Sequence, residues 1–216
     1  APMLGRPASC APDWKNVIAG SWLIASVCID LMNVSSSTMR AVASARKAIG
    51  TRTLFNLLGP LTNPAGALHQ VIGVYAPEKM PLLAEVLRRL GSRHVLFVHG
   101  LDGMDEITLT GPTEVVELRD AAVRQWRLDP TAYGLSVCAP EALAGRDAAY
   151  NALLLKGILE GYDSPLRTAV LLNAAAALYA ADRAASIEEG LVLANHSLDQ
   201  GQALAALKKL IEVSNE

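Results

Sequence analysis

The sequence predicts an α/β fold, in which helices flank a β-sheet. Short apolar runs typical of strands alternate with longer stretches whose apolar residues recur at helical spacing, and no internal repeat or long linker interrupts them. The 216 residues suffice for one compact domain or for a domain and a half. With 51% hydrophobic residues and a net charge of −2, the chain is a core-forming one. Its charge favours neither nucleic acid nor an anionic membrane as a partner.

Strands are predicted over Gln70–Tyr75 and His94–His99, and an amphipathic helix over Glu78–Leu90 connects them. The second strand has a nearly continuous apolar core, as a strand buried on both faces does. Ile107–Leu109 and Glu114–Leu118 are expected to pair as a hairpin around a Gly-Pro turn.

Further helices are predicted from apolar spacing and from capping residues. Asp147 can cap one of them, Ser164 precedes a proline in the tolerated first turn of another, and Ser186 with Glu189 forms a capping box. The predicted spans are Ser36–Ile49, Asp147–Leu159, Pro165–Arg183, a helix after Ser186, and Gln202–Val213.

Cysteine usage predicts a cytoplasmic protein, and the apolar run Val17–Ile29 predicts a buried segment. The three cysteines are widely spaced and odd in number, which fits neither a disulfide framework nor a zinc site. The apolar run is too short to span a bilayer. Because Asp30 follows it without a cleavage pattern, a buried helix or strand is favoured over a secretion signal.

One candidate binding residue is Arg46, which lies within the apolar stripe of the helix predicted over Ser36–Ile49. Its guanidinium should therefore point inward, where it needs an anion or several acceptors. The alternative is that Arg46 reaches the surface or pairs with a structural carboxylate. The apolar, turn-rich segment 57–64 downstream could form a wall for a flat ligand.

A second candidate site is the acidic loop with Asp102, Asp105 and Glu106. It follows a buried strand, and open α/β sheets place their ligand sites at the carboxyl ends of strands. Adjacent carboxylates suit Mg²⁺, which takes oxygen ligands. A solvated acidic turn is the alternative.

The four histidines give no metal-site signal by spacing. His94 and His99 flank a predicted strand, whereas His69 and His196 are isolated in the sequence. None has a partner at the spacing typical of metal ligands.

Three motifs make the chain similar to the anthranilate phosphoribosyltransferase family, in the right order and at the right distances. The first is GTRTLFNLLGPLTNP, the second is HGLDGMDEI followed by GPTEVVEL, and the third is the helical tail with NALLLKGILEG, VLLNAAAAL and EEG. The resemblance runs from about Ser36 to the carboxyl end and corresponds to the carboxyl-terminal two-thirds of such a protein.

The resemblance implies transfer of phosphoribosyl from phosphoribosyl pyrophosphate to anthranilate in tryptophan biosynthesis, with Mg²⁺ and a homodimer. It implies a phosphoribosyltransferase/nucleoside-phosphorylase-like large domain, whose mainly parallel sheet is flanked by helices, beside an incomplete small helical domain. Arg46 matches the arginine that contacts the anthranilate carboxylate, and Gly59 and Pro60 match the loop lining the anthranilate tunnel. Asp105 and Glu106 match the magnesium-binding pair. No catalytic residue is implied.

The chain also departs from the family pattern. It has no counterpart of the GTGGD loop that binds the donor pyrophosphate, of the KHGNR motif or of the amino-terminal helices, and Ser36 stands where the family has a histidine. Residues 1–34 match poorly and form an apolar segment, a candidate helix, before the α/β catalytic-type domain at 35–216. We therefore expect impaired turnover by this chain alone. The alternatives are a non-catalytic relative that binds an aromatic acid or a partner, a half-domain that needs complementation, and a nucleoside phosphorylase.

Overall fold

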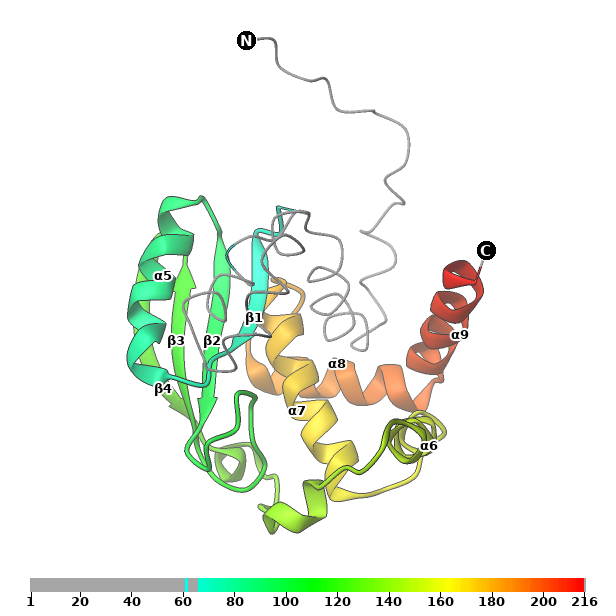
Figure 1. Ribbon diagram of the computed structural model, residues 1–216. Coiled ribbons are helices and arrows are strands. Elements are labelled where there is room, and N and C mark those ends of the chain that lie inside the picture. The colour runs from blue at the N-terminus through cyan, green and yellow to red at the C-terminus, as the bar shows by residue number, and fades with distance from the viewer. Residues whose placement is uncertain (1–60, 62–65, 216) are drawn as a thin grey trace, which may run out of the picture.

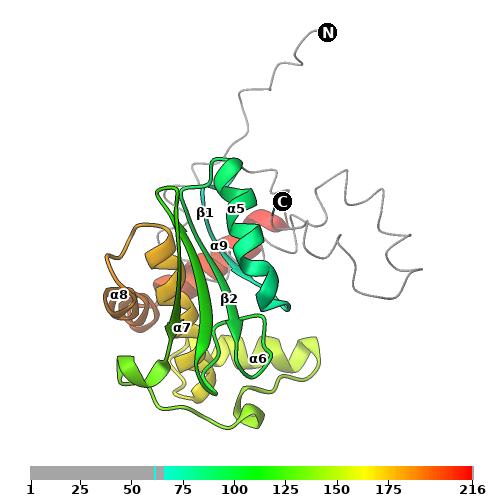
Figure 2. The same cartoon turned by 90° about the vertical axis from the view of Figure 1, so that its left-hand side faces the viewer.

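The computed structural model describes residues 61 and 66–215, which form a layered α/β arrangement (Figure 1). A four-stranded sheet lies between helix α5, Met80–Arg89, on one face and helices α7, Pro165–Ala180, and α8, Ile187–Asp199, on the other (Figure 2). The predicted α/β class is thus confirmed. The helix predicted over Ser36–Ile49 lies outside the described residues.

Within the described residues, the sheet has the strand order β1-β2-β3-β4. The strands span His69–Gly73, His94–Gly100, Thr113–Arg119 and Ala122–Leu128. Only the β1–β2 pair is parallel, so the expectation of a mainly parallel sheet is wrong for these four strands. The reason lies in the connections. Helix α5 provides the crossover that a parallel pair needs, whereas the later strands follow each other through a loop and a tight turn.

The predicted hairpin between Ile107–Leu109 and Glu114–Leu118 is also wrong. Residues 107–109 are not a strand, and β3 forms its hairpin with β4 instead. Asp120 and Ala121 make the turn with φ values of 48° and 66°, the positive angles of the tight turn that matches strand twist. The sequence prediction missed β4 because five of its seven residues are exposed and carry no apolar run.

The predicted helices of the last third are confirmed. They are α6, α7, α8 and α9, with bounds Ala148–Leu159, Pro165–Ala180, Ile187–Asp199 and Gln202–Ser214. Short 3-10 helices span Pro77–Lys79, Pro130–Tyr133 and Pro140–Leu143. The side chains of Asp147, Ser164 and Ser186 accept hydrogen bonds from backbone N–H groups in the first turns of α6, α7 and α8. Glu189 completes the capping box with a variation, since its carboxylate accepts from the N–H of Ala185 at 2.7 Å.

The core follows from the alternation of side chains along the buried strands. Val95 and Phe97 of β2 pack with α5, whereas Leu96 and Val98 pack with α7 on the opposite face. A third apolar cluster joins α6, α7, α8 and α9 away from the sheet. Strand β2 is therefore buried on both faces, as its continuous apolar sequence predicts.

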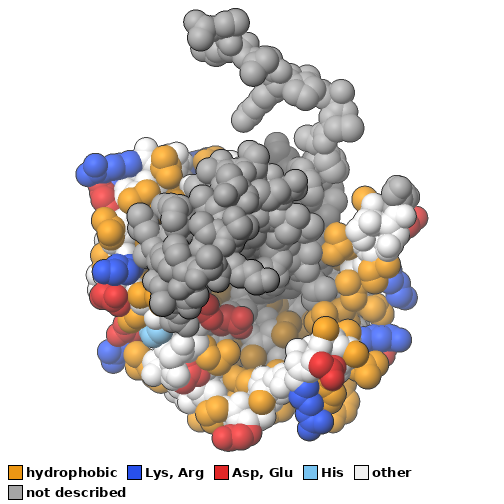
Figure 3. All heavy atoms as spheres, in the orientation of Figure 1, with side chains coloured by type: hydrophobic (Ala, Val, Ile, Leu, Met, Phe, Trp, Pro, Cys, Tyr) orange, Lys and Arg blue, Asp and Glu red, His pale blue; other side chains and the backbone are white. Residues whose placement is uncertain are grey.

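The surface of the described part carries charges of both signs among exposed apolar side chains (Figure 3). Leu153 of α6 is 70% exposed, and Ile211 and Val213 of α9 are each more than half exposed. Within the described residues, no helix combines the length and apolar character needed to cross a bilayer.

Helices α7 and α8 approach each other closely at Gly190. A Cβ atom at this position would lie 2.6 Å from the carbonyl oxygen of Ala175 and 2.8 Å from its Cα, both backbone atoms that cannot rotate away. The spacing of the two helices therefore requires a residue without a side chain at position 190.

We expect Gly190→Ala to lower the free energy of unfolding by about 1–3 kcal/mol, because the added methyl group forces the helices apart. Gly157→Ala in α6 is the matched control, since its Cβ would meet only Cβ of Tyr162 at 3.7 Å. That control should leave stability unchanged or raise it by up to about 1 kcal/mol. Urea denaturation of the two variants measures the difference, and equal stabilities would contradict the close-packing argument.

Candidate functional site

The predicted acidic residues lie on the loop that leaves the carboxyl end of β2. Asp102, Asp105 and Glu106 are all exposed there. This is the edge of the sheet at which α/β folds place ligands. The structure thus places the predicted acidic pair, Asp105 and Glu106, on the surface.

Asp102 organises this loop rather than standing free. One carboxylate oxygen accepts from the hydroxyls of Thr108 and Thr110, both at 2.6 Å, and the other accepts from the N–H of Met104 at 3.1 Å. Partial burial acts to raise the pKa of Asp102, but these hydrogen bonds outweigh it and lower the pKa. Asp102 is therefore a structural anion.

Asp105 and Glu106 behave differently. Within the described part of the chain, their side chains make no hydrogen bond or ion pair. Although the surface of Glu106 is exposed, the surrounding protein atoms remove part of its hydration, and this desolvation and the charge of Asp105 raise its pKa. Two adjacent carboxylates that repel each other are stabilised by a bound cation, and this donor set fits Mg²⁺.

The backbone of Asp105 rests against the end of β1. A Cβ atom at Gly73 would overlap with the carbonyl oxygen of Asp105, so a side chain at this position is incompatible with the observed path of the loop. Gly73 is the last residue of β1. The acidic pair is consequently fixed beside the ends of both β1 and β2.

Asn173 of helix α7 holds the loop from the other side. Its side-chain amide donates to the carbonyl of Ile107 at 2.7 Å, and its amide oxygen accepts from the N–H of Ile107 at 3.2 Å. Because Ile107 is buried, these two bonds satisfy backbone groups that water does not reach. The residue directly after Glu106 is thereby tied to a rigid helix.

The remaining predicted site residues, Arg46, Gly59 and Pro60, lie outside the described residues. The structure therefore describes the two acidic residues predicted to bind a metal and does not describe the residues predicted to bind the acceptor. Sequence reasoning missed Gly73 and Asn173, since each acts on the acidic loop from a distant part of the chain.

A second polar cluster lies at the opposite, amino-terminal end of β2 and centres on Glu117 of β3. Its carboxylate is fully buried and faces helix α7. It accepts hydrogen bonds from the Tyr179 hydroxyl at 2.8 Å, from Trp126 Nε1 at 2.8 Å and from Arg124 Nε at 2.9 Å. His94 Nε2 lies 3.2 Å from the same carboxylate. Four donors thus surround one buried anion.

The ionisation of Glu117 depends on this ring of donors. Burial alone would raise its pKa, but the hydrogen bonds from His94, Tyr179 and the two β4 side chains lower it to about 2. Glu117 is therefore an anion at neutral pH. The cluster joins β2, β3, β4 and the end of α7.

Comparison with known proteins identifies relatives over most of the chain. The family model described as "Glycosyl transferase family, a/b domain" matches residues 16–204, and so begins upstream of Ser36. The anthranilate phosphoribosyltransferase of Methylobacterium nodulans is 48% identical over 191 residues, covering 88% of this chain and 57% of the relative. That of Methylocella silvestris is 51% identical over 179 residues, covering 83% and 51%. The chain spans about half the length of these curated relatives.

Solved structures show the same likeness. Anthranilate phosphoribosyltransferase from Thermus thermophilus superimposes with a TM-score of 0.73 at 44% identity, covering 79% of this chain and 50% of that one. The Saccharomyces cerevisiae enzyme in complex with PRPP and Mg gives a TM-score of 0.73 at 29% identity, covering 82% and 52%. The same yeast enzyme in complex with 4-fluoroanthranilate gives 0.74 at 28% identity, with coverage of 82% and 52%.

The two hydrogen bonds from the side chain of Asn173 to the backbone of Ile107 should stabilise the fold because Ile107 is buried. Asn173→Ala leaves the buried N–H and carbonyl of Ile107 unpaired, and should lower the free energy of unfolding by about 1–3 kcal/mol. Asn151 is the matched control, because its side chain makes the same two bonds with the backbone of Arg146 on the exposed surface. Asn151→Ala should cost less than about 1 kcal/mol, since water replaces the lost partner. Denaturant titration compares them, and similar losses would argue against a buried clamp.

The Glu117 cluster predicts a stability that depends on pH. Glu117→Gln should lower the free energy of unfolding at pH 7 by about 2–4 kcal/mol, because the donors, among them the cationic Arg124, are left facing a neutral amide. The folded-state pKa of about 2 lies below the ordinary value of 4.5, so this stabilisation is present above pH 4.5 and is lost as the pH falls toward 2. The wild-type advantage over the variant should shrink accordingly.

Urea denaturation between pH 7 and pH 3 measures this effect. Glu114→Gln on the same strand is the control, since Glu114 is partly exposed and pairs only with Arg127 at 3.4 Å. It should change stability by no more than about 1 kcal/mol. A constant difference between wild type and Glu117→Gln across this pH range would contradict the assigned charge.

Proposed function

The chain belongs to the anthranilate phosphoribosyltransferase family, and we propose that it serves the transfer of phosphoribosyl from phosphoribosyl pyrophosphate to anthranilate in tryptophan biosynthesis. In this reaction the amine nitrogen of anthranilate forms a bond to C1 of the ribose. The bond from C1 to the pyrophosphate oxygen breaks, and the amine loses a proton. The level of identity to two anthranilate phosphoribosyltransferases over more than four-fifths of the chain is the observation that carries this proposal.

Asp105 and Glu106 are proposed to hold Mg²⁺. Their side chains are exposed and unused by the fold of the described part, whereas the neighbouring Asp102 is fully engaged. The yeast relative was solved with PRPP and Mg, which supports the same partners for this chain. When bound, the cation neutralises negative charge that develops on the pyrophosphate leaving group. Gly73 and Asn173 position the two carboxylates by fixing the backbone on either side of them.

The acceptor side of the proposal rests on Arg46, Gly59 and Pro60. The Arg46 guanidinium is proposed to bind the carboxylate of anthranilate through charge-assisted hydrogen bonds. Gly59 and Pro60 are proposed to line the space that the aromatic ring occupies. The complex of the yeast relative with 4-fluoroanthranilate supports an aromatic acid as the ligand.

The assembly and location that we propose are a homodimer in the cytoplasm. The odd number of widely spaced cysteines supports a reducing compartment. The small net charge gives no reason to expect nucleic acid or a membrane surface as a partner.

The decisive measurement follows anthranilate fluorescence in the presence of the purified chain. We expect a slow loss of signal that requires both phosphoribosyl pyrophosphate and Mg²⁺. Arg46→Ala should lower kcat/KM for anthranilate by roughly ten- to a hundredfold, since a charge-assisted hydrogen bond contributes about 1.5–3 kcal/mol. Glu106→Gln should raise the Mg²⁺ concentration needed for half-maximal rate.

Two exposed residues provide matched controls, Arg183→Ala for the arginine and Glu141→Gln for the carboxylate. Neither should change the rate or the Mg²⁺ requirement. A folded chain that neither consumes nor binds anthranilate would refute the proposal. Equal effects of the site and control substitutions would refute the residue assignments.

A further inference from the structure

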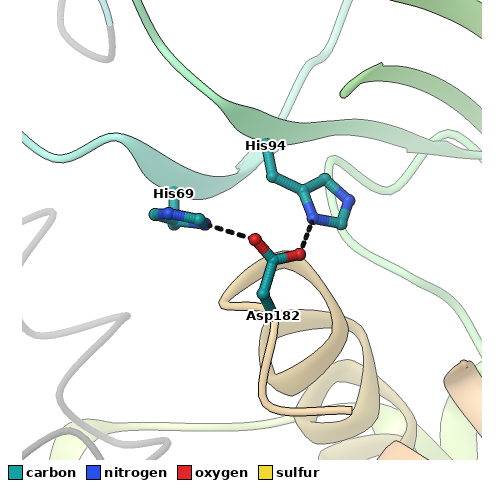
Figure 4. A group of neighbouring side chains, drawn as sticks. All are labelled: His69, His94 and Asp182. Carbon is teal, nitrogen blue, oxygen red and sulfur yellow. Dashed lines mark hydrogen bonds and ion pairs between the residues drawn. The ribbon is translucent and has the colours of Figure 1, made fainter. Parts of the chain in front are cut away.

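Two histidines and an aspartate meet at the amino-terminal end of the sheet, away from the acidic loop (Figure 4). They are His69, the first residue of β1, His94, the first residue of β2, and Asp182, just beyond α7. One candidate ligand atom from each lies within 4.8 Å of the others. They are separated from Asp105 and Glu106 by the length of β2, about 20 Å for seven residues.

The fold itself brings these three residues together. The parallel register pairs His69 with His94, so their side chains leave the same face of the sheet. Helix α7 ends over that face, and Asp182 follows it in the left-handed conformation with φ 53°. An aspartate tolerates this conformation better than most residues, and here it turns the carboxylate toward both rings (Figure 4).

The carboxylate of Asp182 bridges the two histidines. One oxygen lies 2.9 Å from Nδ1 of His94, and the other lies 3.7 Å from Nδ1 of His69. The His69 and Asp182 side chains are 32% and 47% exposed, so the cluster is open to solvent on one side. Ligand atoms of a tetrahedral zinc site lie about 3.3 Å apart. The two distances to Asp182 lie on either side of that spacing.

His94 has the arrangement typical of a metal-binding histidine. Its Nε2 lies 3.2 Å from the buried carboxylate of Glu117, which fixes the ring and directs Nδ1 toward Asp182. Metal-ligating histidines almost always use their second nitrogen in this way, and a carboxylate partner raises the basicity of the ligand. Glu117 is itself held by Tyr179 and Trp126, so the ring orientation is set before a metal binds.

We propose that His69, His94 and Asp182 form a Zn²⁺-binding site, with Nδ1 of each histidine and one carboxylate oxygen as protein ligands and water as the fourth. Two imidazoles and one carboxylate suit a borderline ion such as Zn²⁺ rather than Mg²⁺, which takes oxygen ligands. A bound ion would tie the first residues of β1 and β2 to the end of α7.

Binding changes the hydrogen bonds of both histidines. Nδ1 of His69 donates to the carbonyl of Ala180 at 2.8 Å, and Nδ1 of His94 donates to Asp182. Zn²⁺ takes the place of the proton at each Nδ1, so both of these hydrogen bonds are given up, and the ring proton of His69 moves to its Nε2. Arg119 lies 3.5 Å from Asp182 and competes with the ion for the carboxylate. Its partly exposed guanidinium can turn to solvent, where Tyr179 still offers it an acceptor.

The test titrates the purified full chain with Co²⁺, a visible probe for four-coordinate zinc sites, and then with Zn²⁺. We expect one equivalent of Co²⁺ to give the intense absorption of a tetrahedral complex, which Zn²⁺ abolishes by displacement. Zn²⁺ should also raise the Tm of the chain as its concentration increases.

Variants locate the ion. His69→Gln and Asp182→Asn should each weaken binding at least about tenfold, the smallest loss seen even for outer partners of metal sites. His196→Gln is the matched control, because His196 is exposed on α8. It should leave the absorption unchanged, as should the double variant Asp105→Asn and Glu106→Gln in the acidic loop. Circular dichroism verifies that each variant is folded.

The alternative outcomes are equally specific. Absence of tetrahedral absorption in the wild-type chain would overturn the proposal and leave an ion-pair cluster without a metal. Absorption that survives in both His69→Gln and Asp182→Asn would overturn it too. Absorption lost only in the acidic-loop variant would place the ion at the other end of the sheet and likewise contradict the assignment.

Discussion

The buried charge of Glu117 is the constraint on which the described architecture depends. A carboxylate without exposure needs partners for its lone pairs, and its four partners come from three elements: β2, β4 and helix α7. These partners fix where the carboxyl-terminal half of α7 lies on the sheet. Tyr179 of this cluster and Asn173 of the loop clamp belong to the same helix, separated by about 9 Å of helical rise. The position of the acidic loop is therefore linked to a charge buried at the other end of the sheet.

Elements that are set by interactions between residues close in sequence were predicted correctly, whereas elements that depend on residues far apart in sequence were missed. Caps are local, and Asp147, Ser164 and Ser186 each act within three residues of their partners, so the sequence predicts where their helices begin. Strand β4 has no such local signal. As an edge strand, it exposes Arg124 and Arg127, and its pairing comes from β3. The β3–β4 hairpin was missed for a related reason: the turn at Asp120 and Ala121 contains neither glycine nor asparagine, so the sequence does not mark it as a hairpin turn.

The same distinction applies to the polar sites: the one made of residues close in sequence was predicted, and the one made of residues far apart was not. Carboxylates after a buried strand are visible in the sequence, which predicts a candidate site at Asp102, Asp105 and Glu106. The resemblance to the anthranilate phosphoribosyltransferase family singles out Asp105 and Glu106 among them. His94 and Asp182 lie 88 residues apart, and the parallel register is what places His69 beside His94. No spacing rule detects a cluster of this kind, because its ligands come from two strands and a helix terminus. The dependence of the loop on Gly73 and Asn173 is equally long-range, since Asn173 meets Ile107 across 66 residues.

A loop with three carboxylates can bind a cation only if its own hydrogen bonds leave some of these carboxylates without a partner. Asp102 accepts three hydrogen bonds, two from threonine hydroxyls and one from a backbone N–H, and so supplies the negative charge that the loop needs for its shape. Gly73 and Asn173 fix the backbone around the next two carboxylates without touching their oxygens. The backbone that carries Asp105 and Glu106 is thus held by rigid neighbours, although the charge of Asp105 acts on Glu106. Desolvation and, after it, the charge of Asp105 raise the pKa of Glu106, and a divalent cation bound by the two carboxylates would favour their ionised forms.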